Sequence, residues 1–139
     1  MKSYVLDSYA VLAYFQDEEG AAQVEGLLRE AAAGKASLNL SAVNLGEVAY
    51  ITQRKAEAVG RRKLLSALDA LPLTVVDADR DLALAAAEIK AEYPISYADC
   101  FALALARRGG ATVVTGDPEF KKVQGVVPIR WLPEKPKQR

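Results

Sequence analysis

The chain has 139 residues, with 18 basic and 18 acidic side chains, one cysteine and no histidine. Without histidine there is no Ser-His-Asp or Cys-His nucleophilic pair and no histidine general base, and zinc sites built from Cys and His are excluded as well. The balanced charge gives no global signature of a nucleic-acid-binding protein, so any contact with RNA or DNA must be local.

The length fits a single domain with one hydrophobic core. The lone Cys100 rules out an intramolecular disulfide. The N-terminal apolar run is short and is broken by Asp7, so it does not match a signal peptide, and no segment reaches the length of a membrane span. We therefore expect a cytoplasmic protein with no membrane partner.

Strand-like and helix-like segments alternate along the chain. Strands are predicted from short apolar runs at 3–7, 35–41, 73–78, 111–117 and 126–132. Helices are predicted at 8–15, 18–34, 42–58, 61–71, 79–93 and 97–108, with Ser41 and Ser96 as N-terminal caps and Gly60 as an interruption. This order predicts an α/β fold in which βα repeats build a parallel sheet of about four or five strands, covered on both faces.

Two acidic residues fall at the carboxyl ends of predicted strands, where ligands gather in parallel sheets. Asp7 ends the segment VLD and Asp117 ends the segment VVTGD. Each also has a purely structural interpretation. Asp7 is placed to cap the helix that begins near Tyr9, and Asp117 precedes Pro118, which suits the first position of a helix.

Two further acids lie on predicted helices. Glu47 shares a helix face with the apolar residues Val43 and Ile51, and a carboxylate on such a face needs a partner. Asp99 lies three residues after Ser96, so that it either completes a capping box or also faces a ligand. Four carboxylates gathered at one edge would repel one another unless a cation or protons compensated them. Their oxygens favour Mg²⁺ or Mn²⁺.

Three segments resemble a PIN domain. They are VLDSYAVLAYF at 5–15, the helix start at 44–47, and SYADCFALALARRGGATVVTGDPEF at 96–120. With the intervening helices the resemblance spans nearly the whole chain, and more narrowly it is to the VapC-type toxin ribonucleases of toxin–antitoxin pairs. It implies a PIN-like α/β/α sandwich over residues 1–132, followed by a short polar tail at 133–139.

The resemblance also implies roles for individual residues. Asp7, Glu47, Asp99 and Asp117 match the four acidic positions that surround Mg²⁺ or Mn²⁺ in the family. Ser8 and Thr115 match its two hydroxyl positions, which are expected to orient metal-bound water or phosphate. The implied reaction is metal-assisted hydrolysis of an RNA phosphodiester, which leaves a 5′-phosphate and a 3′-hydroxyl.

Partners follow from the same resemblance: an RNA substrate, a cognate antitoxin protein and a second copy of the chain in a homodimer. Arg54 and Lys121 are candidate contacts to the RNA backbone, against the alternative that they lie on solvated surfaces. An apolar patch in the first helix is a candidate partner surface, although core packing explains it equally; it consists of Tyr9, Leu12, Tyr14 and Phe15.

Alternative functions make different demands on the sequence. A receiver-like signalling module that binds Mg²⁺ needs paired acids after the first strand and a lysine after the last one, whereas LDSY has one acid and no lysine directly follows VVTGD. A haloacid-type phosphatase needs an acid where Tyr9 stands. A PIN fold that has lost catalysis and only binds a partner is the third alternative, and the intact set of four acids argues against it.

Overall fold

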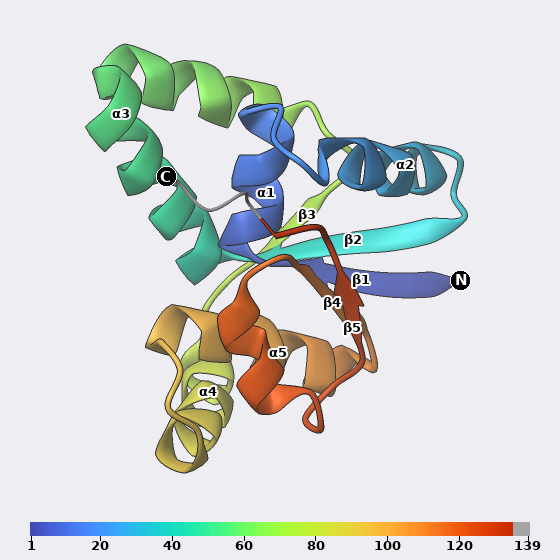
Figure 1. Cartoon of the computed structure of the whole chain (residues 1–139), viewed down its shortest axis with the longest axis vertical. Coiled ribbons are helices and arrows are strands. Elements are labelled where there is room, and N and C mark those ends of the chain that lie inside the picture. Colours follow the sequence, from blue (N-terminus) through green and yellow to red (C-terminus); the bar gives the residue numbers. More distant parts are fainter. Residues whose placement is uncertain (135–139) are drawn as a thin grey trace.

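The structure is a computed structural model of the 139-residue chain that describes residues 1–134 (Figure 1). Strands and helices alternate as expected. The elements are β1 (Lys2–Leu6), α1 (Ser8–Phe15), α2 (Ala21–Ala32), β2 (Ala36–Ser41), α3 (Ala42–Asp69), β3 (Thr74–Val76), α4 (Arg80–Glu92), α5 (Tyr97–Gly109), β4 (Thr112–Thr115), the 3₁₀ helix η1 (Pro118–Val123) and β5 (Ile129–Trp131). No helix among these residues is long and apolar enough to cross a bilayer.

The five strands form one parallel sheet in the order β3-β2-β1-β4-β5. At the carboxyl end of the central strand, Leu6 lies opposite Leu40 of β2 and Val114 of β4. Parallel strands need crossover connections, and these connections place helices over both faces of the sheet. The predicted α/β fold with a parallel sheet covered on both faces is therefore confirmed.

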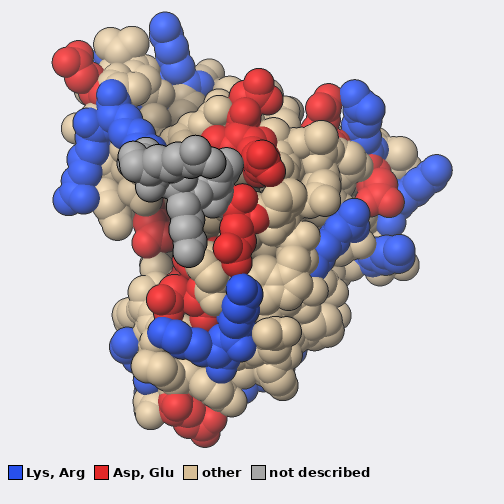
Figure 2. All heavy atoms as spheres, viewed as in Figure 1, with Lys and Arg blue, Asp and Glu red and all other residues tan. Residues whose placement is uncertain are grey.

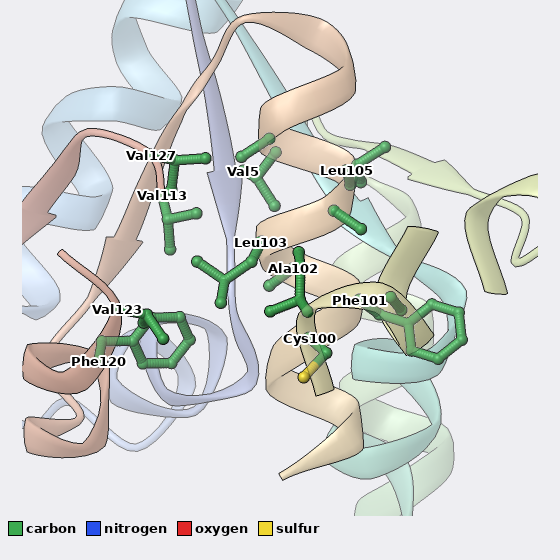
Figure 3. Close-up of a cluster of buried hydrophobic side chains, with 14 of the residues drawn as sticks. Val5, Cys100, Phe101, Ala102, Leu103, Leu105, Val113, Phe120, Val123 and Val127 are labelled. Carbon is green, nitrogen blue, oxygen red and sulfur yellow. The ribbon is translucent and has the colours of Figure 1, made fainter. Parts of the chain in front are cut away.

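The alternation of side chains along β1 divides the core in two. Tyr4 and Leu6 point into a cluster that they share with α1, α2 and α3. Val5 points to the other face, into a cluster formed with α4, α5 and η1 (Figures 1 and 3). Helix α5 is buried from Cys100 through Ala106, because it packs against the sheet, α3 and α4 at once.

The third helix differs from the prediction in its second half. The sequence predicts a helix to residue 58 and a break at Gly60, whereas α3 continues to Asp69 and bends at Ala56 and Glu57. Glu57 takes a positive φ of 61°. Gly60 itself is helical, and a Cβ there would lie 2.3 Å from the Cβ of Ala56. The glycine therefore marks the close approach that the bend creates, and is not itself the break.

The first two residues of the predicted polar tail contact the fold. The backbone carbonyl of Pro133 accepts a hydrogen bond of 3.2 Å from the Tyr9 hydroxyl. Glu134 forms an ion pair of 3.0 Å with Lys121. The rest of that tail, residues 135–139, lies outside the described residues.

Candidate active site

The candidate site lies where the strand order reverses. From β1 the chain passes to β2 and β3 on one side, and it later returns to β4 and β5 on the other side of β1. Connections that leave adjacent strands in opposite directions open a crevice at the strand carboxyl ends. Asp7 directly follows β1 and Asp117 follows β4 by two residues. Both predicted strand-end acids thus meet at this crevice.

A cavity of about 420 Å³ occupies the crevice. All four predicted acids line it, contributed by the ends of β1 and β4 and by the N-terminal parts of α3 and α5. A fifth acid that sequence reasoning missed, Glu119 of η1, also lines it. Its only sequence signal is its position in the first turn after the Asp117 cap, where an acid suits the helix dipole in any case.

Asp7 is almost fully buried, with 1 % of its surface exposed. One carboxylate oxygen caps α1 by accepting from the Ala10 amide at 2.9 Å, so the predicted capping role is confirmed. The other oxygen accepts from the Thr115 hydroxyl at 2.5 Å. Burial raises the pKa of Asp7 to about 8, although hydrogen bonds from Thr115 and Ala10 oppose the shift; repulsion by Asp99 and Asp117 adds to it.

The Thr115 hydroxyl also couples the two strand-end acids. It accepts from the Asp117 amide at 3.0 Å while it donates to Asp7. Asp117 in turn caps η1 by accepting from the Glu119 amide at 2.9 Å, with Pro118 at the start of that helix as expected. The intervening Gly116 has no side chain, and a Cβ there would lie 2.4 Å from the ring of Tyr9.

Asp99 lies in the first turn of α5, where the Ser96 hydroxyl caps its amide at 3.2 Å. Burial raises the pKa of Asp99 to about 6, the hydrogen bond from Ser96 opposes this rise, and repulsion from Asp117, Glu47 and Glu119 adds to it. Two carboxyl groups of the cavity, those of Asp7 and Asp99, therefore keep their protons to a higher pH than an ordinary aspartate does. The cavity has an excess of negative charge that a divalent cation would compensate.

The expected setting of Glu47 was wrong in one respect. Residues Asn44, Val48 and Ala49 form the buried face of α3, whereas Glu47 is half-buried and Tyr50 is 47 % exposed. Of the apolar residues near Glu47, Ile51 lines the acid cavity, whereas Val43 packs against the core cluster formed with α4, α5 and η1. Glu47 therefore lines the cavity while half-buried, and its burial does not require a charged partner.

Comparison with known proteins assigns the chain to a family. Residues 4–126 match the family model of the PIN domain. The chain belongs to the PIN domain family. This assignment rules out the receiver-like interpretation. The comparison with curated proteins found no match.

Solved structures agree with the PIN assignment at the level of the fold. VapBC2 from Rickettsia felis, solved bound to a promoter DNA fragment, matches with a TM-score of 0.74 and 18 % identity over 94 % of this chain and 98 % of that chain. VapC20 from Mycobacterium tuberculosis, a toxin that cleaves the sarcin–ricin loop, matches with a TM-score of 0.67 and 16 % identity. The match covers 85 % of this chain and 92 % of that chain. FitAcB from Neisseria gonorrhoeae matches with a TM-score of 0.67 and 18 % identity, over 91 % of this chain and 95 % of that chain.

A buried polar side chain that the sequence did not single out joins the walls of the PIN-domain cavity. Asn44 is fully buried, and its side-chain oxygen accepts from the Ser41 hydroxyl at 2.9 Å. Its amide nitrogen donates to the Ser8 hydroxyl at 3.3 Å and to the Ala98 carbonyl at 3.2 Å. Asn44 thus ties the beginnings of α1, α3 and α5 together, through residues that adjoin Asp7 and Asp99 in the sequence.

Replacing Asn44 with alanine is expected to destabilise the PIN domain by about 2–3 kcal/mol, because the buried hydroxyls of Ser8 and Ser41 and the Ala98 carbonyl each lose a hydrogen bond. Urea denaturation measures this loss. The matched control is Asn39→Ala on β2, whose half-buried amide donates to the Tyr4 carbonyl at 3.4 Å and to Ser37. Equal losses in the two variants would contradict the linking role of Asn44.

The remaining predicted site residues lie as follows. Ser8 lines the cavity, but its hydroxyl donates to the Asn44 backbone carbonyl at 3.3 Å. Arg54 is exposed two turns beyond Glu47, where its guanidinium lies 4.9 Å from the Tyr50 ring centroid. Lys121 is exposed and pairs with Glu134. Neither cation lines the acid cavity, and their proposed contacts to RNA remain predictions.

The apolar residues of α1 serve the core at least in part. All four are partly buried and pack against the core cluster on their side of the sheet: Tyr9, Leu12, Tyr14 and Phe15. Tyr9 and Leu12 also line the acid cavity. Phe15 instead lines a cavity of about 620 Å³ between the end of α1 and the bent α3. A role for these side chains in binding a partner remains a prediction.

The donor set fits a hard divalent cation. Among residues 1–134, carboxylates are the only charged groups that line the cavity, and oxygen ligands are those that Mg²⁺ and Mn²⁺ prefer. Within residues 1–134, no three acidic side chains are already arranged to enclose an ion. Asp7 and Asp117 cap helices, and Asp99 lies in the first turn of α5 after its Ser96 cap, so the backbone of each acid is held at the start of a helix.

Proposed function

We propose that this PIN domain is a metal-dependent endoribonuclease and the toxin of a toxin–antitoxin pair. The observation that carries the proposal is the convergence of four acids, distant in sequence, on one cavity at the crevice of a PIN fold. The acids proposed to hold Mg²⁺ or Mn²⁺ are Asp7, Glu47, Asp99 and Asp117. A cation in such a site supplies charge neutralisation for the scissile phosphate and a lowered pKa for an attacking water.

The chain's own residues have separable tasks in this proposal. Thr115 holds Asp7 at a fixed rotation by its hydrogen bond, and Asn44 fixes the helix starts that carry Glu47 and Asp99. Asp99 retains a proton to a pKa of about 6 before the cation binds, and it is ionised when it acts as a ligand. Hydrolysis by in-line attack on the phosphodiester leaves a 5′-phosphate and a 3′-hydroxyl.

The names of the structures with similar folds support the proposed partners. Several of the similar structures are complexes named VapBC, and one is named a toxin–antitoxin complex. By analogy we propose a protein antitoxin and a homodimer for this chain. We also propose a cytoplasmic location, where a toxin of this kind would meet its RNA.

Affinity for a divalent cation is expected to rise with pH between 5 and 8. The cation binds the ionised carboxylates, so it must displace the protons that Asp7 (pKa about 8) and Asp99 (pKa about 6) retain. The apparent affinity should gain about tenfold per pH unit between 6 and 8, where one proton is displaced, and more steeply below 6. Calorimetric Mn²⁺ titrations at several pH values measure this. A flat profile would contradict protonation of these acids.

Cleavage of RNA tests the proposed activity directly. The purified protein is incubated with total cellular RNA in Mg²⁺, in Mn²⁺ and in EDTA, and new RNA ends are sequenced. The proposal predicts a few sharp sites with 5′-phosphates that need the cation. RNA left intact with either cation, by protein shown to be folded, would favour the alternative of a PIN fold that only binds a partner.

A further inference from the structure

An exposed aromatic side chain lies just beyond the acid cavity. Tyr50 of α3 is 47 % exposed, although most large apolar side chains of the described residues are buried. The guanidinium of Arg54 stacks over its ring at 4.9 Å from the centroid. Together with Gln53 these two residues line a cavity of about 400 Å³. The arrangement is a flat ring and a cation beside an open hollow.

The position of this hollow is fixed by the helix. Residues 47, 50, 51 and 54 recur on one face of α3 because their spacing matches the helical repeat. Glu47 and Ile51 line the acid cavity. At a rise of 1.5 Å per residue, Tyr50 follows Glu47 by about 4.5 Å along the helix axis and Arg54 by about 10 Å. The ring and the guanidinium therefore continue the cavity's wall outward along α3.

The charges on the surface also favour a nucleic acid that reaches the acid cavity along α3. Figure 2 shows acidic side chains between α3 and η1, with Lys and Arg side chains over α3 on one side and over η1 on the other. An acidic cavity repels a phosphodiester strand, so a nucleic acid that reaches it needs cations beside it. Arg54 supplies one on the helix face that carries Glu47.

We infer that Tyr50 and Arg54 bind the nucleotide next to the scissile phosphate of a single-stranded RNA. The Tyr50 ring stacks on the unpaired base, and Arg54 contacts the adjoining phosphate or extends the stack. This inference rests on the proposed ribonuclease function and narrows its substrate class. A base within a duplex already has both faces stacked, so the arrangement selects loops, bulges and single-stranded ends.

The test measures RNA binding apart from cleavage. All variants carry Asp7→Asn so that the RNA stays intact, and binding to a labelled unstructured 12-nucleotide RNA is followed by fluorescence anisotropy. Tyr50→Ala is expected to raise the Kd about tenfold or more, since stacking on one base is worth about 5- to 150-fold. Tyr50→Phe, which keeps the ring, should stay within about twofold. Arg54→Gln should raise the Kd and reduce the slope of log Kd against log salt concentration by about one, as expected for the loss of one phosphate contact.

Two controls separate this role from a general effect. Tyr97→Ala removes a tyrosine of nearly equal exposure, 46 %, whose hydroxyl donates to the Ala83 carbonyl of α4, and it should bind the RNA as the parent does. Binding to a fully paired, blunt-ended RNA duplex should not change with Tyr50→Ala. Unchanged single-strand binding by Tyr50→Ala, or an equal loss in Tyr97→Ala, would overturn the inference and leave this face to a protein partner.

The outcomes also separate this inference from the proposed activity. Binding that depends on Tyr50, together with no cleavage by the wild-type protein in Mg²⁺ or Mn²⁺, would support the RNA contact and contradict the nuclease. Cleavage that does not depend on Tyr50 would support the nuclease and contradict the contact.

Discussion

Asp7→Asn is expected to lower RNA cleavage by at least about 100-fold and, in the absence of metal, to make the protein more stable at pH 8. The activity falls because a proposed ligand of the cation loses its charge. The carboxamide keeps the shape of the carboxyl group, and it can still accept from Ala10 and donate to Thr115, so the hydrogen bonds of the folded state survive.

The gain in stability follows from the raised pKa of Asp7. A carboxyl group with a pKa of 3.8 when unfolded and about 8 when folded stabilises the fold fully below pH 3.8. That contribution is lost as the pH rises toward 8, because the unfolded chain releases the proton first. A neutral asparagine has no such loss. The free energy of unfolding should therefore rise by about 2–5 kcal/mol at pH 8 and change little at pH 4.

Urea denaturation in EDTA at pH 4 and pH 8, beside the cleavage assay, measures both effects. Asp77→Asn is the matched control, because Asp77 also directly follows a strand, β3, but is exposed and does not line the cavity. It should change neither quantity. Full activity in Asp7→Asn would contradict the proposed site, and lower stability at pH 8 would contradict the protonated state of Asp7.

Phe120→Ala is expected to cost about 3–5 kcal/mol of stability and to impair the site as well. The ring is 1 % exposed and packs beside Val123 in the cluster under η1 (Figure 3). Removing it leaves a cavity that the neighbouring side chains fill only in part. Because η1 starts at the Asp117 cap and carries Glu119, loosening of this helix displaces two acids of the cavity.

Denaturant midpoints and cleavage rates, measured well below each variant's unfolding temperature, test this coupling. Phe120→Leu keeps most of the apolar volume and should retain most of the activity. Leu84→Ala is a control on a side chain that is 53 % exposed, and it should change stability by less than about 0.5 kcal/mol. A Phe120→Ala protein as active as the wild type would show that η1 does not position the site.

The sequence allowed the strand-end acids to be found but not the topology that selects among them. Asp7, Asp77 and Asp117 all follow strands closely. Only the strand order, with β1 and β4 adjacent and β3 at the edge, brings the first and last together and excludes the second. That order depends on contacts between distant segments, which local patterns do not encode.

Local patterns also misjudged surfaces that line a cavity. Val43 and Ile51 share the spacing of a core face with Glu47, yet Val43 packs against the core and Ile51 lines the acid cavity, because cavity walls and cores both use apolar side chains. Asn44 escaped notice because an isolated asparagine near a helix start has many ordinary roles. Its three partners come from α1, the end of β2 and α5, and so only the folded chain identifies it.

Mn²⁺ binding by the wild-type protein and by four single variants, followed by electron paramagnetic resonance, tests the central claim that the four acids share a cation. The variants are Asp7→Asn, Glu47→Gln, Asp99→Asn and Asp117→Asn, with Asp77→Asn as the control. The account predicts saturable binding by the wild type and the control, and at least about tenfold weaker binding by each of the four. Binding that survives unchanged in all four variants, or its absence from the folded wild-type protein, would contradict the account.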